Sequence, residues 1–302
     1  MNYLHYDVFT SQPLLGNQLA VFPDARGLST AGMQAIAHEI NFSETTFIFP
    51  PERSDTDVRM RIFTPAVEMP MAGHPTVGST FALAHVGVIE PARQRFVFGL
   101  SVGPAPVDLV WENGRLQFAW MTQAPPSFGA PVADRDAVAR AIGLGESDLA
   151  AGLPIQEVTC GVPYLLVPLR TRADVDRAGF DRAAYAKFRT AHGLGHEICV
   201  YLFSTETGDD EATAYARMFG ASIGIDEDPA TGSACGPLGS YLVRYGLVPA
   251  AQAAAMSVRQ GVAMGRPSLM QVSVDGAGET LTRVRVGGEA IVVGEGTLNI
   301  GV

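Results

Sequence analysis

The stretch MAGHPTVGSTFALAHVG, residues 71–87, decides the fold together with TGSACGPLGSYLVRYG at residues 231–246. Each begins with small residues and glycine, continues past a proline into an apolar run, and closes on glycine. Pro75 and Pro237 suit the first turn of a helix, where a missing N–H costs nothing, and the closing glycines suit the position just past a helix end. The first run is apolar on nearly every side, which is typical of a helix in the centre of a domain.

The two related stretches lie in comparable halves of the chain and indicate an internal repeat. With 302 residues, the chain exceeds what a single core usually supports, so two domains are expected. The segment 122–132, TQAPPSFGAPV, is rich in proline and is the best linker candidate. We predict an N-terminal domain over 1–121, completed by a C-terminal strand at about 290–302, and a C-terminal domain over 122–289. Each is expected to be an α/β domain in which a sheet wraps its own central helix.

Shorter patterns predict the elements around these helices. A helix with the apolar stripe Met33, Ile36, Ala37 and Ile40 should begin after Ser29 or Thr30, and another should span about 135–143. Strands are expected at 18–22, 45–49, 58–62, 163–168, 198–203 and around Val284 and Val286, with a closing pair of strands within 291–300 around Gly294 and Gly296.

Composition excludes several classes of function. The chain is 47% apolar and carries a net charge of -10 with no basic run, which argues against nucleic-acid binding. Its start lacks a signal-peptide pattern and no apolar run is long enough to cross a membrane, so a membrane role is not expected. Cys160, Cys199 and Cys235 are a poor disulfide framework and suit a reducing cytoplasm.

The glycine-rich helix starts predict a binding site for an anion. Gly73 in the first stretch, and Thr231 and Gly232 in the second, expose backbone N–H groups at the positive end of a helix dipole. One such start alone is more often a plain turn. Two of them facing each other would hold a small carboxylic acid.

Four polar residues accompany these starts, and each also has a purely structural explanation. His74 lies in AGHPT, and Asp228 and Ser233 lie in EDPATGSACG. Glu44 follows a predicted helix and is flanked by Phe42 and Phe47, so its pKa could be tuned by an apolar surround. Alternatively Glu44 caps a helix end, His74 is a core histidine and Asp228 initiates a turn.

Taken together, these segments resemble a known family. FTPAVEMPMAGHPTVGS (63–79) and GIDEDPATGSACGPLGSYL (224–242) are similar to the two signature segments of the PhzF family, the phenazine-biosynthesis isomerase-like proteins. Further matching stretches lie at 6–22, 41–47, 159–169 and 259–274, so the resemblance covers essentially the whole chain in the expected order.

The resemblance implies a fold like that of diaminopimelate epimerase, with two pseudo-symmetric α/β domains of mostly antiparallel sheet and a site in the cleft between them. It implies that Glu44 is the general acid/base and that His74, Asp228 and Ser233 support it. It further implies an isomerase without cofactor or metal, usually a homodimer, whose best-understood member moves a proton on a dihydro-hydroxyanthranilate.

Two departures bear on the mechanism. Related epimerases oppose two cysteines, whereas here Ala72 stands at one helix start and only Cys235 at the other. In addition, Gln18 follows Asn17 where family members often have proline, which changes the loop beside the cleft. Two rival readings stay open: a non-catalytic binding or interaction protein on the same fold, and an epimerase using Glu44 with Cys235.

Two further motifs give weaker indications of function. His192 and His196 have HxxxH spacing without the cysteine pairs of a structural zinc site, so no metal is expected. Arg266, in GRPS, could reach a carboxylate, but a turn anchored by Pro267 is the favoured reading.

Overall fold

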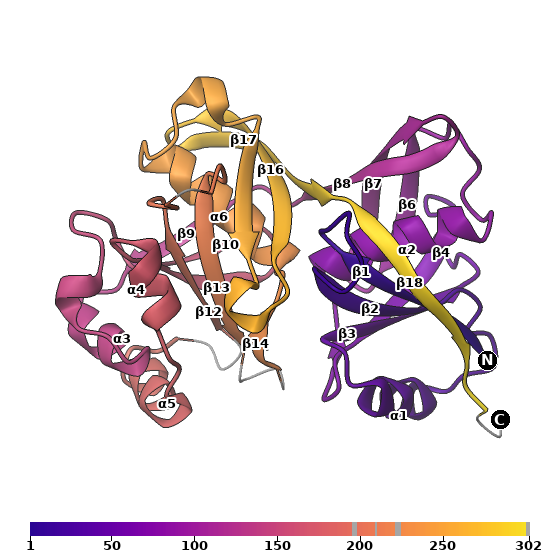
Figure 1. The fold of residues 1–302 in the computed structure, drawn as a ribbon, viewed down its shortest axis with the longest axis horizontal. Coiled ribbons are helices and arrows are strands. Elements are labelled where there is room, and N and C mark those ends of the chain that lie inside the picture. The colour runs from indigo at the N-terminus through magenta and orange to yellow at the C-terminus, as the bar shows by residue number, and fades with distance from the viewer. Residues whose placement is uncertain (195–197, 209, 221–224, 300–302) are drawn as a thin grey trace.

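Two helices, α2 (Gly73–His85) and α6 (Gly232–Arg244), lie at the centres of the two lobes that Figure 1 shows. The computed structural model describes residues 1–194, 198–208, 210–220 and 225–299. Every residue of α2 up to Leu83 and of α6 up to Val243 is buried, which confirms the expectation of central helices. Gly87 and Gly246 adopt positive φ angles of 76° and 68° just past the helix ends, as the sequence predicted.

The prediction that Pro237 lies in the first turn of its helix was wrong. Pro237 is the sixth residue of α6 and not part of the first turn, because the helix begins earlier, at Gly232. At that depth proline withholds an N–H from the preceding turn, and α6 continues past it nonetheless.

The N-terminal lobe is a curved, mostly antiparallel sheet. Its hydrogen-bonded order is β18–β1–β2–β3–β4–β6–β7–β8, with β2–β3 and β4–β6 parallel and β5 beside β4. The strands are β1 (Asn2–Val8), β2 (Asn17–Phe22), β3 (Glu44–Phe49), β4 (Val58–Phe63), β5 (Glu68–Met69), β6 (Arg95–Leu100), β7 (Gly103–Glu112), β8 (Arg115–Gln123) and β18 (Ala290–Thr297). Helix α1 (Thr30–Ile40), capped by Ser29, lies between β2 and β3 in the chain.

The C-terminal lobe repeats this arrangement strand for strand. Its order is β9–β10–β11–β12–β13–β15–β16–β17, with β11–β12 and β13–β15 parallel and β14 beside β13. The strands are β9 (Ser127–Pro131), β10 (Gln156–Thr159), β11 (Pro163–Pro168), β12 (Cys199–Ser204), β13 (Ala214–Gly220), β14 (Ile225–Asp228), β15 (Met256–Gln260), β16 (Ser268–Ala277) and β17 (Thr280–Gly288). The outer helices are α3 (Arg135–Ala141), α4 (Arg172–Arg177) and α5 (Arg182–Ala191). The internal repeat therefore extends over the whole lobe, well beyond the two helix stretches that indicated it.

The prediction of a linker over 122–132 was wrong for most of its length. Gln123 is the last residue of β8, and Ser127–Pro131 forms β9, so only 124–126 and Val132 are irregular. Pro131 is tolerated in β9 because that strand lies at a sheet edge and pairs only with β10. The domain limits at 121 and 289 stay a prediction, since β8 pairs with both β7 and β17 and joins the two lobes in one sheet.

The predicted closing pair of strands was also wrong. Residues 290–297 form one continuous strand, β18, which runs back across the molecule to pair with β1 (Figure 1). Gly294 and Gly296 are within the strand and not at a turn. A side chain at Gly296 would lie 2.5 Å from the ring of Tyr3, so this glycine makes room for an aromatic ring of the neighbouring strand. Ile300, the predicted end of the pair, lies outside the described residues.

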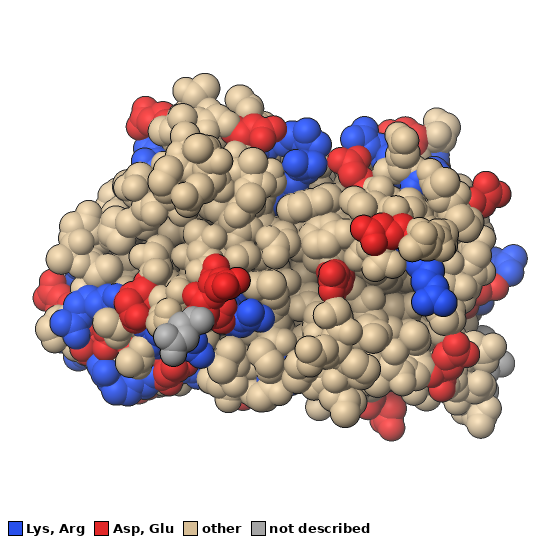
Figure 2. Space-filling model, turned by 45° about the horizontal axis from the view of Figure 1, so that its top comes forward, with Lys and Arg blue, Asp and Glu red and all other residues tan. Residues whose placement is uncertain are grey.

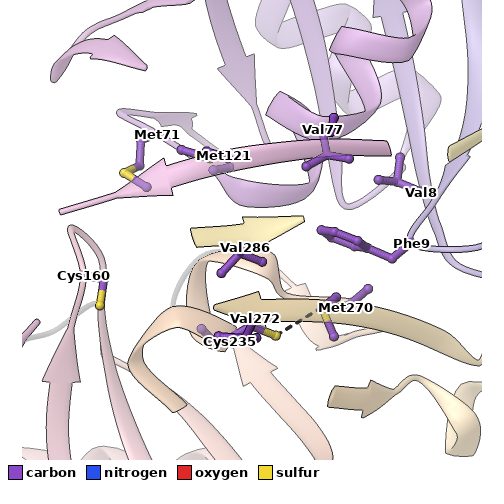
Figure 3. Close-up of a cluster of buried hydrophobic side chains, with 14 of the residues drawn as sticks. Val8, Phe9, Met71, Val77, Met121, Cys160, Cys235, Met270, Val272 and Val286 are labelled. Carbon is purple, nitrogen blue, oxygen red and sulfur yellow. Dashed lines mark hydrogen bonds between the residues drawn. The ribbon is translucent and has the colours of Figure 1, made fainter. Parts of the chain in front are cut away.

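Phe9 is the aromatic centre of the junction between the lobes. Figure 3 shows its ring between Val77 on one side and Val286 and Met270 on the other. It is 1% exposed, has a positive φ of 64°, and exchanges backbone hydrogen bonds with Glu289 and Leu269. A residue of the N-terminal lobe is thereby tied to the C-terminal lobe on both sides of its peptide backbone.

Arg266 forms a second tie between the lobes, which corrects the expectation of a simple turn. Its guanidinium binds the buried carboxylate of Asp7 and donates to the carbonyl oxygens of Leu15 and Gly16. The carboxylate that Arg266 reaches thus belongs to the protein, and the contact fixes the loop that precedes Asn17.

The charged surface is mixed in sign. In Figure 2, blue and red side chains are interspersed on the face shown, and tan residues cover much of the surface between the lobes. Within the described ranges, none of the helices combines the length and apolar character that crossing a bilayer needs. The described part of the chain also holds no group of three or more His, Cys, Asp or Glu residues placed to ligate a metal ion. His192 donates from Nδ1 to the backbone carbonyl oxygen of Phe188 at 2.9 Å. Its partner in the HxxxH motif, His196, lies outside the described residues.

Candidate active site

The N-termini of α2 and α6 meet at the centre of the molecule. A side-chain carbon at Gly73 would lie 2.6 Å from the backbone nitrogen of Ser233, and one at Gly232 would lie 3.3 Å from the Cα of Gly73. Glycine is therefore required at position 73 for the two helix starts to approach this closely. The expected pair of facing helix starts is present, with the positive ends of two helix dipoles directed to one place.

A small cavity lies at this meeting point. Its volume is about 20 Å³, roughly what a single water molecule needs. The polar part of its lining contains Glu44, His74, Asp228, Thr231 and Ser233, with Ala72, Gly73, Ala230 and Gly232 from the helix starts. The structure thus brings together from both lobes nearly all the residues that the sequence singled out.

Strand geometry explains why the N-terminal residues converge. Asn17 and Glu44 are the first residues of the parallel neighbours β2 and β3, whose register pairs Leu19 with Glu44. Neighbouring strands that run in the same direction have their first residues at the same end of the sheet. His74, the second residue of α2, lies above that edge, and its Nδ1 is 3.1 Å from Oε2 of Glu44.

The tautomer of His74 follows from its partners. Its Nε2 lies 3.3 Å from the carbonyl oxygen of Gln18, which can only accept, so Nε2 carries the proton. Burial lowers the pKa of His74 to about 3, so the ring is neutral and Nδ1 presents a lone pair. Asn17 Nδ2 lies 3.3 Å from this Nδ1 atom, and Glu44 Oε2 lies 3.1 Å from it. An ionised Oε2 at that distance would repel the lone pair, whereas a protonated Glu44 can donate a hydrogen bond to it.

Asp228 lies in a different environment from Glu44, although both are buried. One oxygen of Asp228 accepts from Asn17 Nδ2 at 2.7 Å, and the other accepts from Thr231 Oγ1 at 2.6 Å. Oε2 of Glu44 has no hydrogen-bond donor among the described residues. Carboxylates that accept several hydrogen bonds keep their charge more readily than those that accept none.

Burial and mutual repulsion set the ionisation of this pair. Burial raises the pKa of Glu44 well above its ordinary range, and repulsion from Asp228 adds to the effect. Burial also raises the pKa of Asp228, to about 6, but hydrogen bonds from Thr231, Ser43 and Asn17 oppose the rise. The negative charge therefore settles on Asp228 and the proton on Glu44, which is the arrangement that the lone pair of His74 also favours.

Cys235 is not brought into the cavity. It is the fourth residue of α6 and fully buried, and its sulfur contacts the sulfur of Met270 at 3.3 Å (Figure 3). The same sulfur lies 3.5 Å from the hydroxyl of Tyr201. Burial raises the pKa of the Cys235 thiol to about 12, the opposite of an activated thiolate. Among the described residues that line the cavity, Ala72 is present and Cys235 is not.

Sequence reasoning missed Tyr164 and the apolar wall of the cavity. Tyr164, in β11, places its hydroxyl 2.6 Å from Ser233 Oγ. The wall consists of Met69, Met71, Val162, Met218 and Ile225. The sequence feature that could have indicated Tyr164 is its position in the predicted strand 163–168, where it is the one residue with a polar group on its side chain.

Two lobes that each wrap a sheet around a central helix, with polar groups where the helix starts meet, define the class of epimerase-like α/β folds. A solved hydroxyproline epimerase from Agrobacterium vitis shares this fold, with a TM-score of 0.65, 14% identity, and coverage of 98% of this chain and 91% of that one. The model of the PhzC-PhzF family, described as phenazine biosynthesis-like protein, matches residues 6–296. The chain belongs to this family.

Individual relatives agree with the family assignment. A trans-2,3-dihydro-3-hydroxyanthranilate isomerase from Pseudomonas fluorescens is 36% identical over 298 residues, which cover 98% of this chain and 99% of the relative. The crystal structure of a Bacillus anthracis phenazine biosynthesis protein of the PhzF family matches with a TM-score of 0.87 and 30% identity over 99% of both chains. The protein is accordingly an isomerase, and the predictions of family, fold class and enzyme class are confirmed.

Proposed function

We propose that this isomerase moves a proton between carbon atoms of a small carboxylate-bearing substrate, with Glu44 as its only acid/base. The observation that carries the proposal is the contrast between the two buried carboxyl groups. Asp228 accepts hydrogen bonds that hold it as an anion, whereas Glu44 faces the cavity and the lone pair of His74. Glu44 is therefore the group whose proton is free to move.

The raised pKa of Glu44 suits this role. Glu44 must lose its resting proton before it can act as a base. Its ionised form is then a stronger base than a carboxylate with an ordinary pKa, because burial and the charge of Asp228 raise the pKa of Glu44. Once Glu44 has taken a proton from carbon, the same properties make it able to return that proton to another carbon. The N–H groups at the starts of α2 and α6 stabilise the negative charge that develops on the substrate between the two steps.

The lining of the cavity supports a substrate with one polar and one apolar side. Helix N–H groups, Ser233 and Tyr164 suit a carboxylate, and the methionine-rich wall suits the hydrocarbon part of a ring. The trans-2,3-dihydro-3-hydroxyanthranilate of the Pseudomonas fluorescens relative's name has this character. A cavity of about 20 Å³ is too small for such a ring, so the lobes must separate before the substrate enters.

Proton NMR in deuterated water tests the proposal. Wild type, Glu44→Gln and Glu39→Gln are incubated with a panel of small cyclic and amino-acid-derived carboxylates that includes trans-2,3-dihydro-3-hydroxyanthranilate. We expect wild type and Glu39→Gln, whose substitution lies on the exposed side of α1, to place deuterium on a substrate carbon. Glu44→Gln should be at least 100-fold slower, since one general acid/base contributes about that factor or more.

The rival readings give different results in the same experiment. If folded wild type exchanges no carbon-bound proton across the panel, the acid/base proposal fails, and ligand-induced thermal shifts then test for a binding protein. An epimerase using Cys235 would retain exchange at one face of a stereocentre in Glu44→Gln and lose it in Cys235→Ala. The buried position of Cys235 outside the cavity speaks against that outcome. The expected homodimer remains a proposal for gel filtration.

A further inference from the structure

Gln260 lies directly behind the candidate site and has no part in the chemistry described so far. It is the last residue of β15, where Met256 and Val258 point inward with it, and it is 0% exposed. A polar side chain at an inward-facing strand position is unusual and calls for hydrogen-bond partners. Gln260 is not among the described residues that line the cavity.

The partners of Gln260 determine the orientation of its amide group. Oε1 accepts from the backbone N–H of Thr231 at 3.2 Å and from the hydroxyl of Tyr201 at 2.9 Å. Nε2 donates to the backbone carbonyl of Asp228 at 2.7 Å and to Oγ1 of Thr231 at 3.0 Å. A backbone N–H can only donate and a carbonyl can only accept, so the reversed amide would lose both backbone bonds.

The fixed amide in turn fixes the hydroxyl of Thr231. Because Gln260 Nε2 donates to Oγ1 of Thr231, the proton of that hydroxyl is directed away from Gln260. The hydroxyl also lies 2.6 Å from Oδ2 of Asp228. Thr231 is therefore a donor to Asp228, and the chain from Gln260 through Thr231 to Asp228 has one direction.

We propose that Gln260 is a positioning residue that keeps Asp228 ionised, and thereby leaves the mobile proton of the site on Glu44. The effect of Gln260 on catalysis rests on the proposed function, in which Glu44 carries the proton. The effect of Gln260 on the charge of Asp228 is independent of that proposed function. Without Gln260, the Thr231 hydroxyl can turn and accept a hydrogen bond from a protonated Asp228, so the ionised form of Asp228 is no longer favoured over the neutral form.

The other titratable groups around Asp228 are limited in what they can do near neutral pH. Glu44 on β3 shares the cavity, and Glu227 precedes Asp228 on β14 but is paired with Arg217. The remaining titratable side chains near Asp228 are His74 on α2, Tyr164 on β11, Tyr201 on β12 and Cys235 on α6. Burial keeps all four neutral, because it lowers the pKa of His74 and raises those of the other three. Glu44 is thus the group whose titration is linked to that of Asp228.

The test measures the pKa of Asp228 directly by NMR of protein with ¹³C-labelled carboxyl groups, and separately the pH profile of kcat/KM. Gln260→Met keeps the side-chain length and removes all four hydrogen bonds. Thr231→Val removes the donor itself, and Thr231→Ser keeps it. Gln156→Met is the matched control, since Gln156 is a buried glutamine of the same lobe whose hydrogen bonds are with Gly129 and Tyr245.

We expect the pKa of Asp228 to rise by about one unit, tenfold in the acid equilibrium, in Gln260→Met. In the double variant Gln260→Met/Thr231→Val, the pKa of Asp228 should rise no further than in Thr231→Val alone, because both substitutions act through the hydroxyl of Thr231. Thr231→Ser and Gln156→Met should leave the pKa of Asp228 within about 0.3 units of wild type.

Three results would overturn the proposal: an unchanged pKa of Asp228 in Gln260→Met, shifts that add in the double variant, or an equal shift in Gln156→Met. Should Gln260→Met fold poorly, Thr231→Val against Thr231→Ser decides whether the hydroxyl directs the charge. If wild type proves inactive as an isomerase, the NMR arm still tests Gln260, so the two failures are distinguishable.

Discussion

Replacement of Gly73 by alanine tests whether the contact between the two helix starts sets the catalytic geometry. The new methyl group would lie 2.6 Å from Ser233 N, 2.7 Å from Gly232 C and 2.9 Å from Gly232 Cα, all of them backbone atoms. Backbone cannot turn aside as a flexible side chain can. Relief to an ordinary contact of 3.4 Å requires the helix starts to separate by about 0.8 Å.

The size of the effect follows from that displacement. A misplacement of about 1 Å in an active site costs on the order of 100-fold in rate. Glu44 and His74 move with the N-terminal lobe, whereas Asp228 and Ser233 move with the other, so the separation falls across the site. We expect kcat/KM of Gly73→Ala to fall about 100-fold in the isomerisation assay. Folding stability should change much less, because the helix interior is untouched.

Gly32→Ala is the matched control. Gly32 lies in the first turn of α1, and its added carbon would be no closer than 3.4 Å to another atom, so wild-type activity is expected. Gly232→Ala disturbs the same junction from the C-terminal lobe, since its added carbon would lie 2.9 Å from the Phe9 ring. If folded Gly73→Ala keeps more than about a third of wild-type kcat/KM, close contact of the helix starts is not needed and this reasoning is refuted.

The remaining predictions concern ionisation and the junction. kcat/KM should fall as pH drops through the pKa of Glu44, which burial and the charge of Asp228 raise well above its ordinary range, because Glu44 must be deprotonated to accept a proton from carbon, so activity is present above that pKa and lost below it. A pH profile with its limb near 4.5 would show an unperturbed Glu44. In Asp228→Asn the loss of the neighbouring charge should lower the pKa of Glu44, measurable by the same carboxyl NMR, and a rise would contradict the repulsion assigned to the pair. Phe9→Ala should lower the free energy of unfolding by about 3–5 kcal/mol in urea denaturation, because it empties the core between the lobes, and a loss below about 1 kcal/mol would mean that the junction repacks freely.

The repeat and the chemistry do not follow the same symmetry. In the matching strand orders, β3 corresponds to β12 and β5 to β14, so Glu44 corresponds to Cys199 and Asp228 to Met69. The register pairs Leu19 with Glu44 in one lobe and Tyr164 with Cys199 in the other. Each lobe thus supplies one carboxyl group from a different strand, and the site is asymmetric although the scaffold is a repeat.

The sequence by itself determined the features that depend on local pattern. The glycine-closed apolar stretches specified α2 and α6, since a helix apolar on all sides must be buried, and the alternation of residues specified strands such as β4. The signature segments identified the family and pointed to His74, Asp228 and Ser233, and the matching stretch 41–47 pointed to Glu44. The sequence patterns failed where the outcome depended on distant partners, as at Gly296, which reads as a turn residue until the ring of Tyr3 is placed beside it.

Only the tertiary structure decided how the site is charged. Asn17 and Asp228 are 211 residues apart in the chain, and whether one donates to the other is set by how the two lobes pack. The pKa of a buried carboxyl group depends on all the groups that exclude water from it and on every hydrogen-bond donor directed at it. The residues next to it in the sequence do not determine which groups these are. For the same reason the sequence showed Tyr164 only as a polar residue in an apolar strand, and Gln260 only as the end of an alternating strand. The packed fold made each of them a partner of the site.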